Sequence, residues 1–209
     1  MGRARLNRTA LASLTVLIAA SMWYIVFTEP PLGFWPSMTL ATSTLLFISA
    51  VLFKIRKQKR KVTPRGVALG LISGLLLYLF LAAGFHVTRQ VLPSISSDAA
   101  IVYSYGSQTN IALIAALLLF PIAPAEEFYW RGLLQRVWQD HLGATKALLL
   151  ASAVYGLIHV VTLNPSLTLV ASMGGVIWGW LFHRTGSLVP GILSHVLFVE
   201  LVFVILPLG

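Results

Sequence analysis

The 209-residue sequence contains no cysteine, and only 10% of its residues are charged. The lack of cysteine excludes a disulfide framework, a thiolate nucleophile and any zinc site with cysteine ligands. A soluble domain carries about a quarter charged residues, whereas 57% of this chain is hydrophobic. The scarcity of charge therefore excludes a soluble enzyme and a disordered chain, and it indicates an integral membrane protein.

Long apolar runs make up most of the chain. They cover residues 9–28, 34–53, 66–88, 110–138, 146–162, 166–183 and 187–207. A helix that crosses a membrane needs about 20 predominantly apolar residues. The sequence thus predicts an all-α fold, a polytopic membrane helical bundle of about seven transmembrane helices.

Acidic residues are rare: the chain has 6 Asp and Glu against 15 Lys and Arg. Seven of the 15 basic residues lie between the second and third runs, at Lys54, Arg56, Lys57, Lys59, Arg60, Lys61 and Arg65. Basic residues that flank spans face the cytoplasm, so we expect the N-terminus and the 54–65 loop there. Glu29 and the 93–109 loop are then outside. This placement favours a topological role over nucleic-acid binding.

Glycines recur at four-residue intervals in two of the runs. Gly66, Gly70 and Gly74 do so in the third run, and Gly175 and Gly179 in the sixth. Helices in lipid associate where small residues let their backbones approach closely. We therefore interpret these glycines as packing seams between helices.

Ionisable residues at membrane depth are costly and usually mark a functional site. The fourth run carries Glu126, Glu127 and Arg131, the fifth carries His159, and the seventh carries His195. Glu127 and Arg131 are four residues apart, so they share a helix face and are predicted to pair. A purely structural ion pair is the alternative interpretation of Glu127 and Arg131. It does not explain why a second glutamate, Glu126, lies at membrane depth, where its side chain can contact another helix.

Two prolines, Pro121 and Pro124, precede the glutamates. Because proline removes a backbone donor and clashes with the preceding turn, we expect the helix to restart near Pro124. Glu126 and Glu127 would then lie in its first turn, where the helix dipole favours negative charge. At about 1.5 Å of rise per residue, the glutamates and both histidines fall in the inner two-thirds of the membrane, which predicts one shared cavity nearer the cytoplasm.

These residues resemble three ordered motifs of the CAAX-protease and bacteriocin-processing family of intramembrane endopeptidases, also called Abi. The first motif, Glu-Glu-x-x-x-Arg, is matched by Glu126, Glu127 and Arg131. The second, Phe-x-x-x-His, is matched by Tyr155 and His159, with tyrosine in place of phenylalanine. The third, His-x-x-x-Asn/Asp, begins at His195 but ends in Val199. The resemblance covers about residues 110–200.

The resemblance implies hydrolysis of a peptide bond in a hydrophobic or lipid-modified peptide by a glutamate-activated water. Glu126 would be the general base, helped by His159. Glu127 and Arg131 would orient the site, and His195 would stabilise the oxyanion. We therefore treat residues 1–209 as one integral-membrane domain, in which residues 1–108 form N-terminal spans and residues 109–209 carry the catalytic motifs.

The valine at position 199 departs from the family pattern. The matching family residue supplies an amide or carboxylate to the oxyanion hole, and valine cannot donate a hydrogen bond. Either another group takes over this task, with Ser194, Asn164 and Tyr155 as candidates, or the activity is weak.

Cofactor and partner expectations also follow from the resemblance. We expect a cofactor-free glutamic peptidase, with a zinc ion held by Glu and two His as the alternative, since that ligand set suits zinc. The expected partners are membrane lipid and the peptide substrate, without nucleic acid, in a bacterial or archaeal plasma membrane. Two other functions stay open: a non-enzymatic membrane peptide-binding or immunity protein with a degenerate site, and a proton-coupled transporter.

Overall fold

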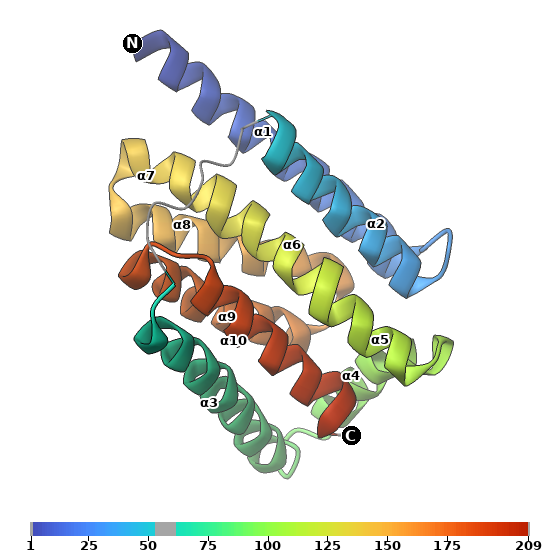
Figure 1. Cartoon of the computed structure of the whole chain (residues 1–209). Coiled ribbons are helices and arrows are strands. Elements are labelled where there is room, and N and C mark those ends of the chain that lie inside the picture. Colours follow the sequence, from blue (N-terminus) through green and yellow to red (C-terminus); the bar gives the residue numbers. More distant parts are fainter. Residues whose placement is uncertain (1, 53–61, 209) are drawn as a thin grey trace.

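The computed structural model describes residues 2–52 and 62–208, and these fold into a bundle of long, roughly antiparallel helices (Figure 1). Within the described residues, six helices are long and apolar enough to cross a membrane, and a shorter apolar helix spans Val189–Ile205. The prediction of a polytopic bundle of about seven helices is therefore confirmed. Residues 54–61 of the predicted cytoplasmic loop lie outside the described part of the chain.

The helices follow the apolar runs closely. The α-helical segments are α1 (Gly2–Thr28), α2 (Phe34–Phe47), α3 (Pro64–Thr88), α4 (Ser94–Ser104), α5 (Ile111–Leu117), α6 (Ala123–Glu127), α7 (Arg136–Leu142), α8 (Ala144–Leu157), α9 (Pro165–Thr185) and α10 (Val189–Glu200). Wider π-helical turns occupy Ile48–Leu52, Leu118–Ile122, Phe128–Gln135 and Leu201–Ile205, and short 3₁₀ helices occupy Tyr105–Gln108 and Ile158–Thr162.

The predicted helix break before the two glutamates is wrong. One continuous helix runs from Ile111 to Leu142, made of α5, α6 and α7 joined by two π-helical segments. Pro121 lies inside the first π-helical segment, and wide turns of this kind accommodate local disruptions of the α-helical ladder. Glu126 and Glu127 therefore sit within a continuous helix and not at a free helix N-terminus.

The predicted 93–109 loop is also wrong, because most of it is helical. α4 is too short to cross a membrane, and it packs against the N-terminal part of α9. The Asp98 carboxylate accepts a hydrogen bond from the Ser166 hydroxyl at 2.6 Å, and the Asp98 carbonyl accepts one from the Asn164 amide at 2.8 Å. An acidic group beside the start of α9 is favoured by the helix dipole, so these contacts fix α4 to the bundle.

The bundle has two distinct ends (Figure 1). The first turns of α1, the start of α3 and the α7–α8 corner lie at one end, which we call the basic end. α4 and the C-terminus lie at the opposite end, which we call the α4 end. Of the seven basic residues of 54–65, Arg65 lies in the described part of the chain, in the first turn of α3 at the basic end.

Glycines do form the packing seams that their spacing predicted. A Cβ added to Gly70 or Gly74 would come within 2.6 Å of the carbonyl oxygen of Pro190 or Ser194, both on α10. A Cβ added to Gly175 would meet Ser152 and Tyr155 of α8 at 3.2 Å. The backbones of α3 and α10, and of α8 and α9, therefore approach each other as closely as only glycine allows.

We expect the Gly74→Ala substitution to destabilise the protein, because the added methyl group overlaps the α10 backbone. Overpacking of a close contact costs about 1–3 kcal/mol, and each kcal/mol shifts the melting temperature by about 2–4 °C in a chain of this size. Gly84→Ala on the same helix is the matched control, since its Cβ would meet nothing within 4 Å. Thermal unfolding in detergent measures both, and equal melting temperatures would contradict the close contact.

Candidate active site

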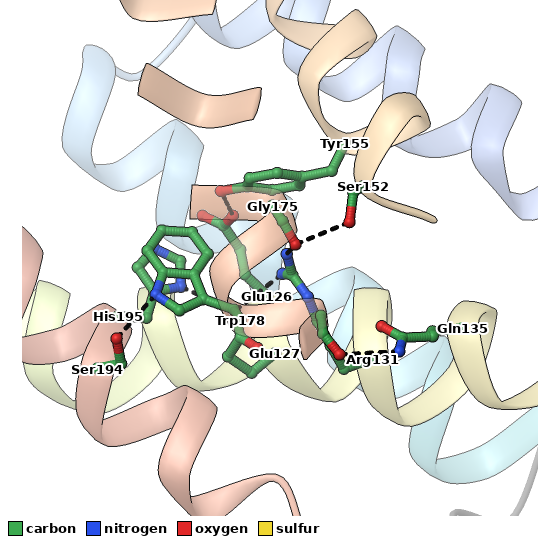
Figure 2. A network of polar contacts seen from close by, with 11 residues as sticks. Glu126, Glu127, Arg131, Gln135, Ser152, Tyr155, Gly175, Trp178, Ser194 and His195 are labelled. Atoms are coloured by element: carbon green, nitrogen blue, oxygen red, sulfur yellow. Dashed lines mark hydrogen bonds and ion pairs between the residues drawn. The ribbon is translucent and has the colours of Figure 1, made fainter. Parts of the chain in front are cut away.

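Glu126 lies in the middle of the bundle and faces a neighbouring helix. Its side chain is almost fully buried, with 3% of its surface exposed. The Tyr155 hydroxyl of α8 donates a hydrogen bond to Glu126 Oε2 at 2.8 Å. This bond occupies one carboxylate oxygen and leaves Oε1 for a water or a substrate group (Figure 2).

The second glutamate, Glu127, accepts hydrogen bonds from two basic side chains, Arg131 and His195. Arg131 donates a hydrogen bond to Glu127 Oε1 at 2.9 Å, which confirms the pair predicted from the four-residue spacing. His195 Nδ1 lies 3.1 Å from the same oxygen. Because a carboxylate only accepts, His195 carries a proton on Nδ1, and this N–H donates a hydrogen bond to Glu127. Three predicted site residues from two helices thus meet at one buried oxygen atom.

Arg131 is held on its other side by the glycine-lined face of α9. Its second terminal nitrogen donates to the Gly175 carbonyl at 3.0 Å, and the Ser152 hydroxyl donates to that same carbonyl at 2.9 Å. One turn further on, the Gln135 amide donates to the Gly179 carbonyl at 3.0 Å. The sequence analysis missed Ser152 and Gln135, although the Gly175 and Gly179 spacing marks the close approach that brings them within reach.

An aromatic wall orients the imidazole of His195. The ring stacks on Trp178 of α9 with 3.6 Å between ring centroids and 16° between planes. The Trp178 indole donates in turn to the Ser194 hydroxyl at 3.2 Å, and Ser73 of α3 donates to that hydroxyl as well. Trp178 gave no signal in the sequence, because a tryptophan within an apolar run is indistinguishable from an ordinary core residue.

His159 is engaged through both of its ring nitrogens. Nδ1 lies 2.8 Å from the Tyr155 carbonyl, which only accepts, so Nδ1 is the donor. Nε2 accepts a hydrogen bond from the Trp23 indole of α1 at 3.2 Å. The ring also contacts Tyr155 edge to face, with 5.1 Å between centroids. His159 therefore adjoins Glu126 through Tyr155, and its bonding pattern is that of a neutral imidazole.

The zinc alternative stays a prediction, and the geometry bears on it in two ways. Within residues 2–52 and 62–208, no three His, Asp or Glu side chains are grouped so that they could hold a metal ion. A zinc ligand must offer a free lone pair, but Nε2 of His159 accepts the Trp23 bond. Nδ1 of His195 is directed at Glu127 and not at a site shared with His159.

Glu126, His159 and His195 line one cavity of about 330 Å³, together with Tyr155 and Val199. The prediction of one shared cavity is confirmed for Glu126 and both histidines, but it is wrong for Glu127. Glu127 and Arg131 lie behind the cavity wall, since neither lines it. The expectation that the cavity lies toward the basic end is wrong, because its lining extends from Glu126 toward the α4 end.

The structure distinguishes the three groups suggested as substitutes for the missing donor at position 199. Asn164 caps α9 by accepting from the Leu167 amide, and it donates to the Asp98 carbonyl, so its amide is oriented toward the start of α9 and α4. Ser194 is buried outside the cavity lining and accepts from Trp178. Asn164 and Tyr155 both line the cavity, but of the three only Tyr155 bonds Glu126, with its hydroxyl directed at the carboxylate.

Comparison with known proteins identifies one match. Residues 108–199 match the family model described as type II CAAX prenyl endopeptidase Rce1-like. This segment contains all three motifs on which the resemblance rests, and the resemblance to the CAAX-protease family is thereby confirmed. The comparison with curated proteins finds no match, and neither does the comparison with solved structures.

Proposed function

We propose, from the match of residues 108–199 to the family model of type II CAAX prenyl endopeptidases, that the chain hydrolyses peptide bonds within the membrane by a glutamate-activated water. The family match supports an endopeptidase embedded in the membrane, and the substrate and mechanism are our proposal. The observation that carries it is the position of Glu126, a buried carboxylate at the inner end of an apolar cavity with one oxygen held by Tyr155. The proposed substrate is a hydrophobic or lipid-modified peptide.

Glu126 acts in this proposal as the general base. Its Oε1 takes a proton from a water molecule while the water oxygen attacks the carbonyl carbon of the scissile peptide bond. The carbonyl oxygen becomes an oxyanion, and the C–N bond then breaks as Glu126 returns the proton to the departing amine nitrogen. The products are a new carboxyl terminus and a new amino terminus, so no cofactor is consumed. A positioned base or acid of this kind contributes about 10²–10⁴-fold to a rate.

His195 is the proposed donor to the oxyanion. Because Nδ1 donates to Glu127, Nε2 donates to the substrate only when the ring is an imidazolium. In that form the two cations, Arg131 and His195, balance the two carboxylates, Glu126 and Glu127. A four-charge cluster that sums to zero suits a poorly hydrated site, where an uncompensated charge is costly. Preorganised donors at an oxyanion are worth about 2.7–4 kcal/mol each.

Tyr155 and His159 complete the site as proposed positioning residues. The Tyr155 hydroxyl fixes the rotamer of Glu126. His159 bonds the Tyr155 carbonyl and receives the Trp23 indole, so it fixes the 3₁₀ turn that follows Tyr155. The proposal therefore separates Glu126, which would touch the water, from His159, which acts through Tyr155.

Replacement of Tyr155 by phenylalanine is expected to lower kcat while KM changes little. A hydrogen bond to a charged group is worth about 1.5–3 kcal/mol, which corresponds to about a 10- to 100-fold loss of rate. Tyr129→Phe is the matched control, because it removes a buried tyrosine hydroxyl that bonds Thr15 and not the site. Full activity of Tyr155→Phe would contradict the assignment.

The new termini of cleaved peptides test the proposed peptidase function. Membranes with and without the chain are compared by mass spectrometry of new N- and C-termini, and the proposal expects termini within hydrophobic segments that depend on the chain. Purified protein that binds a hydrophobic peptide without cleaving it would instead support the second candidate, a peptide-binding protein. That candidate is favoured by Val199, which lines the cavity one helical turn after His195 and cannot donate a hydrogen bond.

A further inference from the structure

The cavity extends in one direction only from the level of Glu126. On the helix that carries it, Glu126 is the lining residue closest to the basic end, and on α10 the lining begins at His195. On α8 it begins at Tyr155, and on α9 it ends at Trp178. These four side chains form the floor of the cavity, and the remaining lining residues of these helices lie between the floor and the α4 end.

Directly beneath this floor, toward the basic end, the bundle is packed. A separate cavity at the basic end, lined by Arg65, Gly66 and Arg184 among others, includes none of the four floor residues. Trp130, Leu134 and Leu181 are fully buried on the basic-end side of the floor, as are the side chains of Arg131 and Gln135. Arg131 and Gln135 are bonded to carbonyl groups of α9 and thereby hold this region together. A substrate therefore reaches Glu126 from the α4 end.

The charge distribution relates these ends to the two sides of a membrane. Arg65 lies in the first turn of α3 at the basic end, and Arg8, Arg136, Lys146 and Arg184 occur in the parts of their helices nearest the same end. Six further basic residues precede Arg65 in the sequence, outside the described part of the chain. At the α4 end the acidic residues Glu29 and Asp98 occur together with a single basic residue, Arg89. By the positive-inside rule the basic end faces the cytoplasm, so the α4 end faces outward.

We propose that the active-site cavity takes its substrate from the extracytoplasmic side, as a hydrophobic or lipid-modified segment of an exported peptide in the outer leaflet. This inference rests on the proposed peptidase function and names the side on which its substrate occurs. The cavity walls are aromatic and aliphatic, which suits an apolar segment, while Asp98 and Ser166 provide a polar rim at the α4 end. A cytoplasmic protein with a modified C-terminus would have to pass the packed layer of Trp130, Leu134 and Leu181 beneath the floor.

Single cysteines measure this orientation directly, because the natural chain has none. Ala99→Cys places a thiol on α4 in the cavity lining, and Lys146→Cys places one on an exposed residue at the start of α8. We expect a charged, membrane-impermeant maleimide added to intact cells to label Ala99→Cys, and Lys146→Cys only after the membrane is permeabilised. The opposite pattern would overturn the proposed side of access.

Cleavage assays separate failure of this inference from failure of the peptidase proposal. If the cavity takes substrate from outside, labelling of Ala99→Cys in intact cells with a bulky impermeant maleimide abolishes the chain-dependent termini, and these termini belong to exported peptides. Chain-dependent termini found in cytoplasmic proteins, unaffected by the label, would refute outer access and leave the peptidase intact. Termini that are the same with and without the chain would refute the peptidase, whichever cysteine is labelled.

Discussion

Replacement of Glu126 by glutamine is expected to abolish peptide cleavage without preventing folding or membrane insertion. Glutamine retains the size of glutamate and can still accept the Tyr155 hydrogen bond, but it cannot take a proton from water. Loss of a general base lowers kcat by about 10²–10⁴-fold. The measurement is the rate of cleavage of a hydrophobic peptide reporter by purified protein in liposomes, followed by mass spectrometry of the products.

Glu200→Gln is the matched control for this substitution. Glu200 is also a glutamate within the helical bundle, on α10, but it does not line the cavity. The same chemical change at the two positions should therefore abolish activity at one and preserve it at the other. Equal cleavage by wild-type protein and Glu126→Gln would remove Glu126 from the mechanism, and with it the proposed glutamate-activated water.

Replacement of Arg131 by methionine is expected to be among the most destabilising changes in the chain. Arg131 and Glu127 are both essentially inaccessible to solvent, and their ion pair measures 2.9 Å. Removal of one partner of a buried ion pair costs about 3–5 kcal/mol, because the remaining charge is left uncompensated. We expect a large drop in the melting temperature and in the yield of folded protein, measured by thermal unfolding in detergent.

The double substitution Glu127→Gln with Arg131→Met separates the loss of charge balance from the loss of the contact. It removes both charges, while glutamine still accepts from His195, so most of the lost stability should return. Cleavage should stay low, because the negative charge that faces His195 is gone. A double variant as unstable as Arg131→Met alone would show that packing of the guanidinium, and not charge balance, dominates its contribution.

Local features of the fold followed from the sequence because they depend on short stretches of chain. The spans are set by the length of each apolar run, and the Glu127–Arg131 pair by a four-residue spacing within one helix. The glycine seams followed from the spacing of Gly70 and Gly74 on one helix and of Gly175 and Gly179 on another. Each of these needs only the helical period and the cost of burying polar groups in lipid.

Features that depend on how helices are rotated against one another did not follow. The Tyr155–Glu126 and Trp23–His159 contacts join residues that lie 29 and 136 positions apart. Successive side chains of a regular α-helix are about 100° apart around its axis. π-Helical segments before and after α6 change this angle, so regular α-helical geometry does not predict which neighbouring helix Glu126 faces. The helical rise predicted a cavity nearer the cytoplasm, and this was wrong for a similar reason. The rise gives the depth of each residue in the membrane, but it does not show toward which end the cavity extends from Glu126.

The bond between Trp23 and His159 joins the N-terminal spans to the candidate site. The family match begins at residue 108, yet Trp23 of α1 supplies a partner to a motif histidine, and Phe27 of the same helix lines the cavity. The first span therefore contributes to the shape of the cavity and to the orientation of His159. Substitutions in α1 can thus change the cavity without altering a motif residue.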